Sequence, residues 1–147
     1  MDSKATVQAL MDSIQKGDFV KAKTYLSKDF QFSGPVPEPV NGDVWLAMSK
    51  ELKIAFPDLD YHFHVENMNA DTANITAQLK GTHTGQLDLS DMHMGVIPAT
   101  HKSFSAEREI GKVTVNGDQV TSWAQQPTVG AGLKAILGQL GVQPPTM

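Results

Sequence analysis

The spacing of apolar residues changes along this sequence, from the period of a helix to the period of a strand. The order of these two patterns constrains the fold more than any other feature. Up to residue 56, apolar residues recur at the spacing of helices, apart from a short strand-like alternation at Phe30 and Phe32. From Tyr61 onward, apolar and polar residues alternate, as in strands that are buried on one face. Alternating strand–helix–strand units are absent. The sequence therefore predicts an α+β domain in which helices come first and an antiparallel sheet follows.

The predicted helices have recognisable ends. Asp2 or Ser3 can cap the first, Gly17 can stop it, and Asp18 can cap a second, short helix. A loop rich in proline and glycine then leads to Asp43, the expected cap of a third helix that ends before Pro57. A short closing helix is expected over residues 133–140.

A first, short strand is predicted at Phe30 and Phe32. Four longer strands follow, and the last two are joined by the hairpin signal Asn116-Gly117, whose residues tolerate positive φ. Residues 86–101 form a long excursion between strands, a length more typical of a binding loop than of a simple connection. The expected longer strands cover residues 61–66, 73–83, 104–115 and 119–126.

Composition and charge exclude several classes of function. The 147 residues suit one domain, 1–147. Twelve Lys and Arg against sixteen Asp and Glu leave a net charge of −4 and no basic stripe, so neither nucleic acid nor a membrane surface is an expected partner. Cysteine is absent, and no secretory signal or membrane-spanning run is visible, so a cytoplasmic protein is expected.

Three local signatures carry a family resemblance: Ala55-Phe56-Pro57-Asp58-Leu59, Gly81-Thr82-His83-Thr84-Gly85 and Gln139-Leu140-Gly141-Val142. Together with the Asn116-Gly117 hairpin and Trp123, they resemble the SnoaL-like (polyketide cyclase-like) family of the nuclear-transport-factor-two-like superfamily. The resemblance implies a cone-shaped domain in which three helices pack against a strongly curved antiparallel sheet around an apolar cavity, commonly in a homodimer. It also implies proton abstraction beside a carbonyl, with isomerisation, dehydration and hydrolysis among the relatives.

One position departs from that pattern. The resemblance places the catalytic Asp of the cyclases four residues after Trp123, where this chain has Pro127. Proline cannot transfer a proton. The chain therefore resembles a divergent branch of the family that lacks the usual acid and base.

Three residues are candidates for the missing proton transfer. His83 carries an imidazole that titrates near neutral pH, although a buried His hydrogen-bonded to a neighbouring strand is the alternative. Glu107 and Glu109 share a strand parity, so one or both can point inward, where burial would raise the carboxyl pKa toward neutrality. The alternative for this Glu-Arg-Glu run is a solvated strand face.

Four residues are candidates for ligand binding. Trp45 and Met48 belong to an apolar helical stripe with Leu52 and Ala55, which can be core or pocket wall. Trp123 and Gln125 share the strand parity of position 127, so they should face the same way as the lost Asp. Simple packing for Trp123 and an exposed position for Gln125 remain the alternatives.

No metal and no cofactor are expected. His62 and His64 lie on one strand face, and His93 or His101 could join them, but no recognised ligand spacing is present. The expected ligand is a small hydrophobic molecule that bears a carbonyl. Two functions remain open at this point: a cyclase or isomerase that works by general acid/base catalysis, and a non-catalytic binding or dimeric interaction module.

Overall fold

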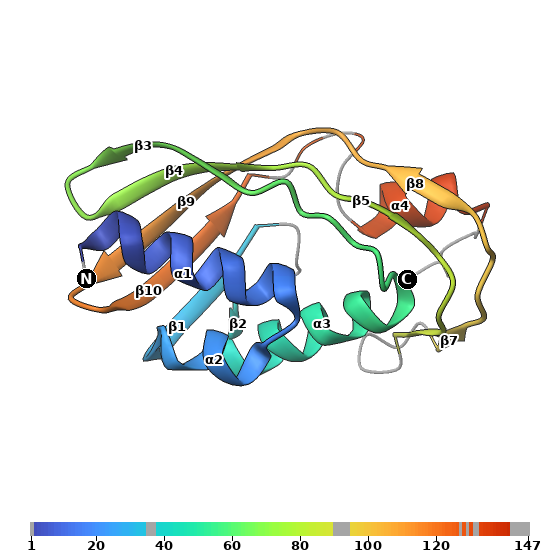
Figure 1. Cartoon of the computed structure of the whole chain (residues 1–147), viewed down its shortest axis with the longest axis horizontal. Helices are drawn as coiled ribbons and strands as arrows, with labels where there is room; N and C mark the ends of the chain where they lie inside the picture. The colour runs from blue at the N-terminus through green and yellow to red at the C-terminus, as the bar shows by residue number, and fades with distance from the viewer. Residues whose placement is uncertain are drawn as a thin grey trace.

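Helices from the N-terminal part of the chain lie on one side of a curved sheet in the computed structural model (Figure 1). The structure describes residues 2–34, 38–89, 95–126, 128, 130 and 133–141. The α+β class is confirmed. The helices are α1 (Ser3–Lys16), α2 (Phe19–Thr24), α3 (Gly42–Ala55) and α4 (Leu133–Gln139).

The main sheet has six strands in the order β2-β1-β10-β9-β4-β3. They are β1 (Leu26–Ser33), β2 (Val40–Asn41), β3 (His64–Asn69), β4 (Thr72–Ala77), β9 (Glu109–Asn116) and β10 (Gln119–Gln125). Two small ladders pair β5 (Lys80–Thr82) with β8 (Ser103–Ser105) and β6 (Leu87–Asp88) with β7 (Val96–Ile97).

The expected wholly antiparallel sheet needs one correction, because β1 and β10 run parallel. The other neighbours in the main sheet are antiparallel. A period of two reports which residues are buried but not the direction of the neighbouring strand. No hairpin joins β1 to β10, so the local sequence carries no signal for their orientation.

The helix ends follow the predicted chemistry at two of three sites. Asp2 accepts a hydrogen bond from the Ala5 amide at 2.7 Å, and Gly17 ends α1 with φ of 79°. Asp18 caps α2. The cap of α3 is Asn41 rather than the predicted Asp43, since Asn41 Oδ1 accepts from the Val44 amide at 2.9 Å. Asp43 lies in the first turn and pairs with Lys23 at 3.0 Å.

Two of the predicted strands are broken in ways that matter for the site. The strand expected over residues 73–83 ends at Ala77 and resumes as β5, because the backbone near Gln78 bonds to Tyr61 instead of β9. The strand expected over residues 104–115 is split into β8 and β9. Each break interrupts the alternation from which the direction of the side chains was predicted.

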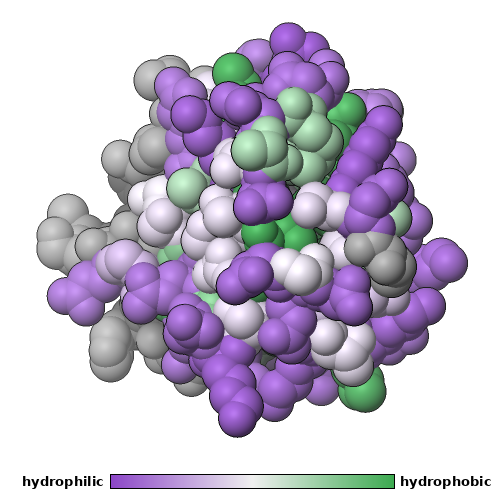
Figure 2. Space-filling model, turned by 90° about the vertical axis from the view of Figure 1, so that its left-hand side faces the viewer, coloured by the Kyte–Doolittle hydropathy of each residue, from purple (hydrophilic) through white to green (hydrophobic). Residues whose placement is uncertain are grey.

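The core lies between the helices and the sheet. On α1, Val7, Leu10, Met11 and Ile14 are at most 1% exposed. The surface at the end of the molecule where β3 meets β4 is mostly hydrophilic, with small, scattered apolar areas (Figure 2). None of the helices in the described part of the chain is long and apolar enough to span a bilayer.

Candidate functional site

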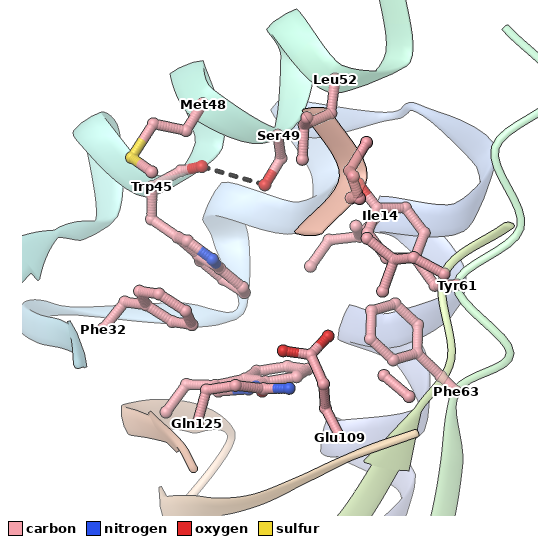
Figure 3. A pocket seen from close by; sticks show the side chains of 14 residues that line it. Ile14, Phe32, Trp45, Met48, Ser49, Leu52, Tyr61, Phe63, Glu109 and Gln125 are labelled. Carbon is pink, nitrogen blue, oxygen red and sulfur yellow. Dashed lines mark hydrogen bonds between the residues drawn. The ribbon is translucent and has the colours of Figure 1, made fainter. Parts of the chain in front are cut away.

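A cavity of about 160 Å³ lies between α3, the end of α1 and the inner face of the sheet, and Ile136 of α4 contributes to its wall. Its wall is mostly apolar, and its polar side chains are Glu109, Gln125, Ser49 and the hydroxyl-bearing Tyr61 (Figure 3). A mainly apolar cavity with a few convergent polar groups is the usual form of a small-molecule site.

The predicted helical stripe supplies one wall. Trp45, Met48 and Leu52 of α3 all border the cavity, and Ala55 is fully buried. Trp45 stacks on Phe32 of β1 with ring centroids 5.4 Å apart and contacts Trp123 of β10 at 5.1 Å. The stripe therefore serves as both core and pocket wall, and the aromatic contacts restrict the positions of the rings.

Glu109 brings a carboxyl group into this apolar space. It is the first residue of β9, its side chain is directed into the cavity (Figure 3), and it is only 6% exposed. Burial raises the pKa of Glu109, and a hydrogen-bonding contribution from Gln125 opposes part of that rise. A carboxyl group with a raised pKa in an apolar pocket can act as a general base and then as an acid.

Gln125 and Trp123 form a connected pair on the neighbouring strand. The indole Nε1 of Trp123 donates a hydrogen bond to Gln125 Oε1 at 2.8 Å, so the amide nitrogen of Gln125 is the group that can donate to Glu109. The backbone of Gln125 pairs with Gly111, where an added Cβ would come within 3.0 Å of Gln125 Oε1. The small residue on β9 thus makes room for the amide side chain.

The structure brings together five of the residues predicted from sequence: Trp45, Met48, Glu109, Trp123 and Gln125 all line the cavity. Glu107 does not. Glu107 lies in the segment between β8 and β9, where its side chain is exposed. Its backbone amide donates to Gly130 O at 2.9 Å. Because that segment is not a strand, the shared parity of Glu107 and Glu109 has no structural meaning here.

His83 is buried but lies outside the cavity lining. Its Nδ1 accepts a hydrogen bond from the Thr100 amide at 3.2 Å and lies 3.0 Å from Thr100 Oγ1, while its ring packs on Phe56. Burial lowers the pKa of His83, and the nearby charge of His101 lowers it further, against a raising contribution from Gly85. This geometry is that of a neutral histidine that joins two loops.

Replacing His83 with alanine is expected to lower the free energy of unfolding by about 1–3 kcal/mol, because the Thr100 amide loses its acceptor. Any proton-transfer activity should be retained. Denaturant unfolding measures the first effect, and exposed His64 replaced by alanine is the matched control. A stable variant without activity would return His83 to a catalytic role.

The remaining histidines do not form a metal centre in the part of the chain that the structure describes, where no group of three or more His, Asp or Glu side chains converges. His62 bonds instead to Gln78 O at 2.7 Å and lies 3.4 Å from Asp60. His93 and Pro127 lie outside the described residues.

Sequence reasoning missed Tyr61 and Ser49 as cavity residues. A signal was present for Tyr61, since it alternates with Phe63 and both rings line the cavity. Ser49 lies between Trp45 and Leu52 on the cavity side of α3, and its hydroxyl donates to Trp45 O at 2.9 Å (Figure 3). As a polar residue in an apolar stripe, it gives no sequence signal for a pocket wall.

Comparisons with known proteins agree on the fold. The family model described as SnoaL-like polyketide cyclase matches residues 4–131. No curated protein matches the sequence significantly.

Three solved structures illustrate the likeness. AclR, a proposed hydroxylase from Streptomyces galilaeus, is 16% identical with a TM-score of 0.72, over 99% of this chain and 84% of that one. IdmH, a proposed polyketide cyclase from Streptomyces antibioticus, is 17% identical with a TM-score of 0.71, over 97% and 100%. A proposed SnoaL-like polyketide cyclase from Jannaschia sp. CCS1 is 21% identical with a TM-score of 0.68, over 91% and 90%. At such identities the likeness establishes the fold alone.

Proposed function

The chain belongs to the SnoaL-like polyketide cyclase family, and we propose that it binds an apolar, carbonyl-bearing molecule and transfers a proton at a carbon beside the carbonyl. The observation that carries this proposal is the buried carboxyl group of Glu109 in an otherwise apolar cavity. Cyclisation and isomerisation both begin with that proton transfer.

In this proposal Glu109 supplies the base that the family resemblance places at position 127, where this chain has proline. The two strands are neighbours, and Gln125 pairs with Gly111, two residues from Glu109. A base on β9 therefore reaches the same cavity as residues at the end of β10. Trp123 holds Gln125 through its indole hydrogen bond, and Gln125 in turn orients the carboxylate.

Glu109 acts first as a base and then as an acid in the proposed reaction. Ionised Glu109 removes a proton from the carbon beside the carbonyl, which leaves an enolate and a neutral carboxylic acid. Isomerisation requires a carbon–carbon double bond beside the carbon that loses the proton: the acid returns the proton to the far carbon of that double bond, which moves into conjugation with the carbonyl. In ring closure the enolate carbon bonds to a second carbonyl carbon of the same molecule, and that carbonyl's oxygen receives the proton from Glu109.

The cavity sets the size and character of the ligand. An apolar protein cavity of about 150 Å³ can hold a benzene molecule, so the 160 Å³ here accommodates a ring-sized group. Met48, Leu52, Phe63 and Leu79 of the lining are only partly buried, which allows a larger ligand to extend outward. Trp45 and Trp123 both line the cavity, so an aromatic ligand can contact them.

The test is deuterium incorporation into 2-tetralone, a bicyclic ketone with acidic protons on both carbons beside its carbonyl. The protein is incubated with this ketone in D₂O, and loss of those proton signals is followed by NMR. Exchange faster than in buffer is the expected result. Binding without exchange would instead support the alternative, a non-catalytic binding module, which the Pro127 substitution favours. The homodimer that the resemblance implies stays a prediction.

A further inference from the structure

Tyr61 is held firmly where the chain passes from α3 to β3. Its backbone amide donates to Gln15 Oε1 at 2.8 Å, and its carbonyl oxygen accepts from the Gln78 amide at 2.8 Å. The ring stacks on Phe63 with centroids 4.7 Å apart and planes inclined by 9°. Backbone and ring contacts together leave the side chain little freedom, so the position of its hydroxyl is determined by the fold.

The hydroxyl of Tyr61 is buried and forms no hydrogen bond of regular geometry with the described residues, and the Ser49 hydroxyl is its polar neighbour. The nearby Ser49 hydroxyl donates its own hydrogen to Trp45 O. Leaving a buried hydroxyl unpaired costs about 1–3 kcal/mol, and such groups in folded proteins are nearly always paired. Because Tyr61 lines the cavity, a ligand oxygen that comes within hydrogen-bond distance of this poorly paired donor would satisfy it.

The chemical character of this donor matches the charge that the proposed reaction develops. Removal of a proton beside a carbonyl places negative charge on the carbonyl oxygen, and a fixed O–H donor in an apolar site stabilises such an oxyanion without reorganisation. Burial raises the pKa of Tyr61, against a lowering hydrogen-bond contribution from Ser49, so the hydroxyl keeps its proton. Glu109 enters the cavity from β9, a different wall (Figure 3).

We propose that Tyr61 Oη donates the hydrogen bond that holds the ligand's carbonyl oxygen, while Glu109 removes the proton from the adjacent carbon. This inference rests on the proposed function. It narrows the ligand class to compounds whose ketone oxygen can accept a hydrogen bond from Tyr61, because a hydrocarbon of the same shape leaves the Tyr61 hydroxyl without an acceptor. It also makes Tyr61 a catalytic residue, since its hydroxyl touches the atom on which charge develops.

The experiment compares 2-tetralone with tetralin, which has the same ring system without the carbonyl. Binding is followed by quenching of Trp45 and Trp123, the two tryptophans of the chain, which both line the cavity. Tyr61→Phe should weaken binding of 2-tetralone about tenfold, a loss of one neutral hydrogen bond. Binding of tetralin should be unchanged. Equal effects on both ligands would overturn the inference.

Tyr25→Phe is the matched control, because Tyr25 is the other tyrosine of the chain and does not line the cavity. It should leave both affinities unchanged. A second measurement does not depend on the folding of a variant: the carbonyl stretch of 2-tetralone bound to the wild-type protein should lie at lower frequency than in a hydrocarbon solvent. A stretch at the hydrocarbon value would contradict a hydrogen bond from Tyr61.

The two proposals fail in distinguishable ways. If Glu109→Gln abolishes exchange but Tyr61→Phe does not discriminate between the two ligands, the proton transfer stands and the role of Tyr61 is wrong. If the wild-type protein prefers the ketone through Tyr61 but catalyses no exchange, Tyr61 is a binding residue and the proposed reaction is wrong. If neither ligand binds the wild-type protein, both proposals fail.

Discussion

Exchange of the protons beside the carbonyl of 2-tetralone is expected to slow by about 10²–10⁴-fold when Glu109 is replaced by glutamine, the usual contribution of a general base. Glutamine has nearly the same shape as glutamate but cannot accept the proton. The buried position should tolerate it, because the substitution removes a carboxyl group from an apolar site. NMR in D₂O gives the rate, and thermal unfolding verifies that the variant is folded.

Glu107→Gln is the control for this prediction, since it makes the same chemical change two residues away on an exposed side chain outside the cavity. Its exchange rate should equal that of the wild-type protein. Equal losses in both variants would point to a general effect of charge, and an unchanged rate in Glu109→Gln would remove Glu109 from the mechanism.

The pH profile gives the same residue an independent signature. The base must be ionised, so the exchange rate should rise with pH as Glu109 loses its proton. Because burial raises the pKa of Glu109, this rise should be centred above the ordinary glutamate value of 4.5. The Glu109→Gln variant should lack the rise. A profile centred at or below the ordinary value would indicate that the carboxylate is solvated.

Replacing Trp123 with alanine is expected to lower the free energy of unfolding by about 3–5 kcal/mol, the usual cost of removing a large buried aromatic side chain. Trp123 is 2% exposed and contacts Trp45 and Phe63 with ring centroids 5.1 and 5.7 Å apart. Its loss also removes the indole donor to Gln125 Oε1. Equilibrium unfolding in urea measures the change.

The matched control is Val20→Ala on α2, where the apolar side chain is 83% exposed. Its effect should stay within about 0.5 kcal/mol, as for most surface substitutions. A loss below about 1 kcal/mol in Trp123→Ala would mean that the neighbouring rings collapse into the vacated space. In that case the aromatic wall would not be the rigid support that the proposed site requires.

Local chemistry was sufficient to predict the elements whose signals lie within a few residues of each other. Asp2 and Gly17 delimit α1 because a side-chain acceptor and a left-handed glycine act within one helical turn. Gly117, with φ of 65°, forms the predicted turn between β9 and β10. Trp123 and Gln125 face the cavity together because β10 continues without a break between them.

Tertiary structure decided which of the predicted catalytic candidates enter the cavity. Glu109 points inward and Glu107 outward because the chain leaves β8 and begins β9 only at Glu109. His83 follows the end of β5, in a ladder separate from β4, and so packs against Phe56 and Thr100 rather than in the cavity. Tyr61 reaches the cavity because Gln15 of α1 and Gln78 hold its backbone.

The same contrast applies to the α+β class. Helical periodicity followed by alternation predicted it, because burial of an apolar face imposes the period of each element on the local sequence. The positions at which strands break, and the parallel pairing of β1 with β10, depend on hydrogen bonds between residues far apart in the chain. Such long-range hydrogen bonds produce no periodic pattern in the sequence. Only the tertiary structure therefore shows that Glu109 and Tyr61 line the same cavity from different walls.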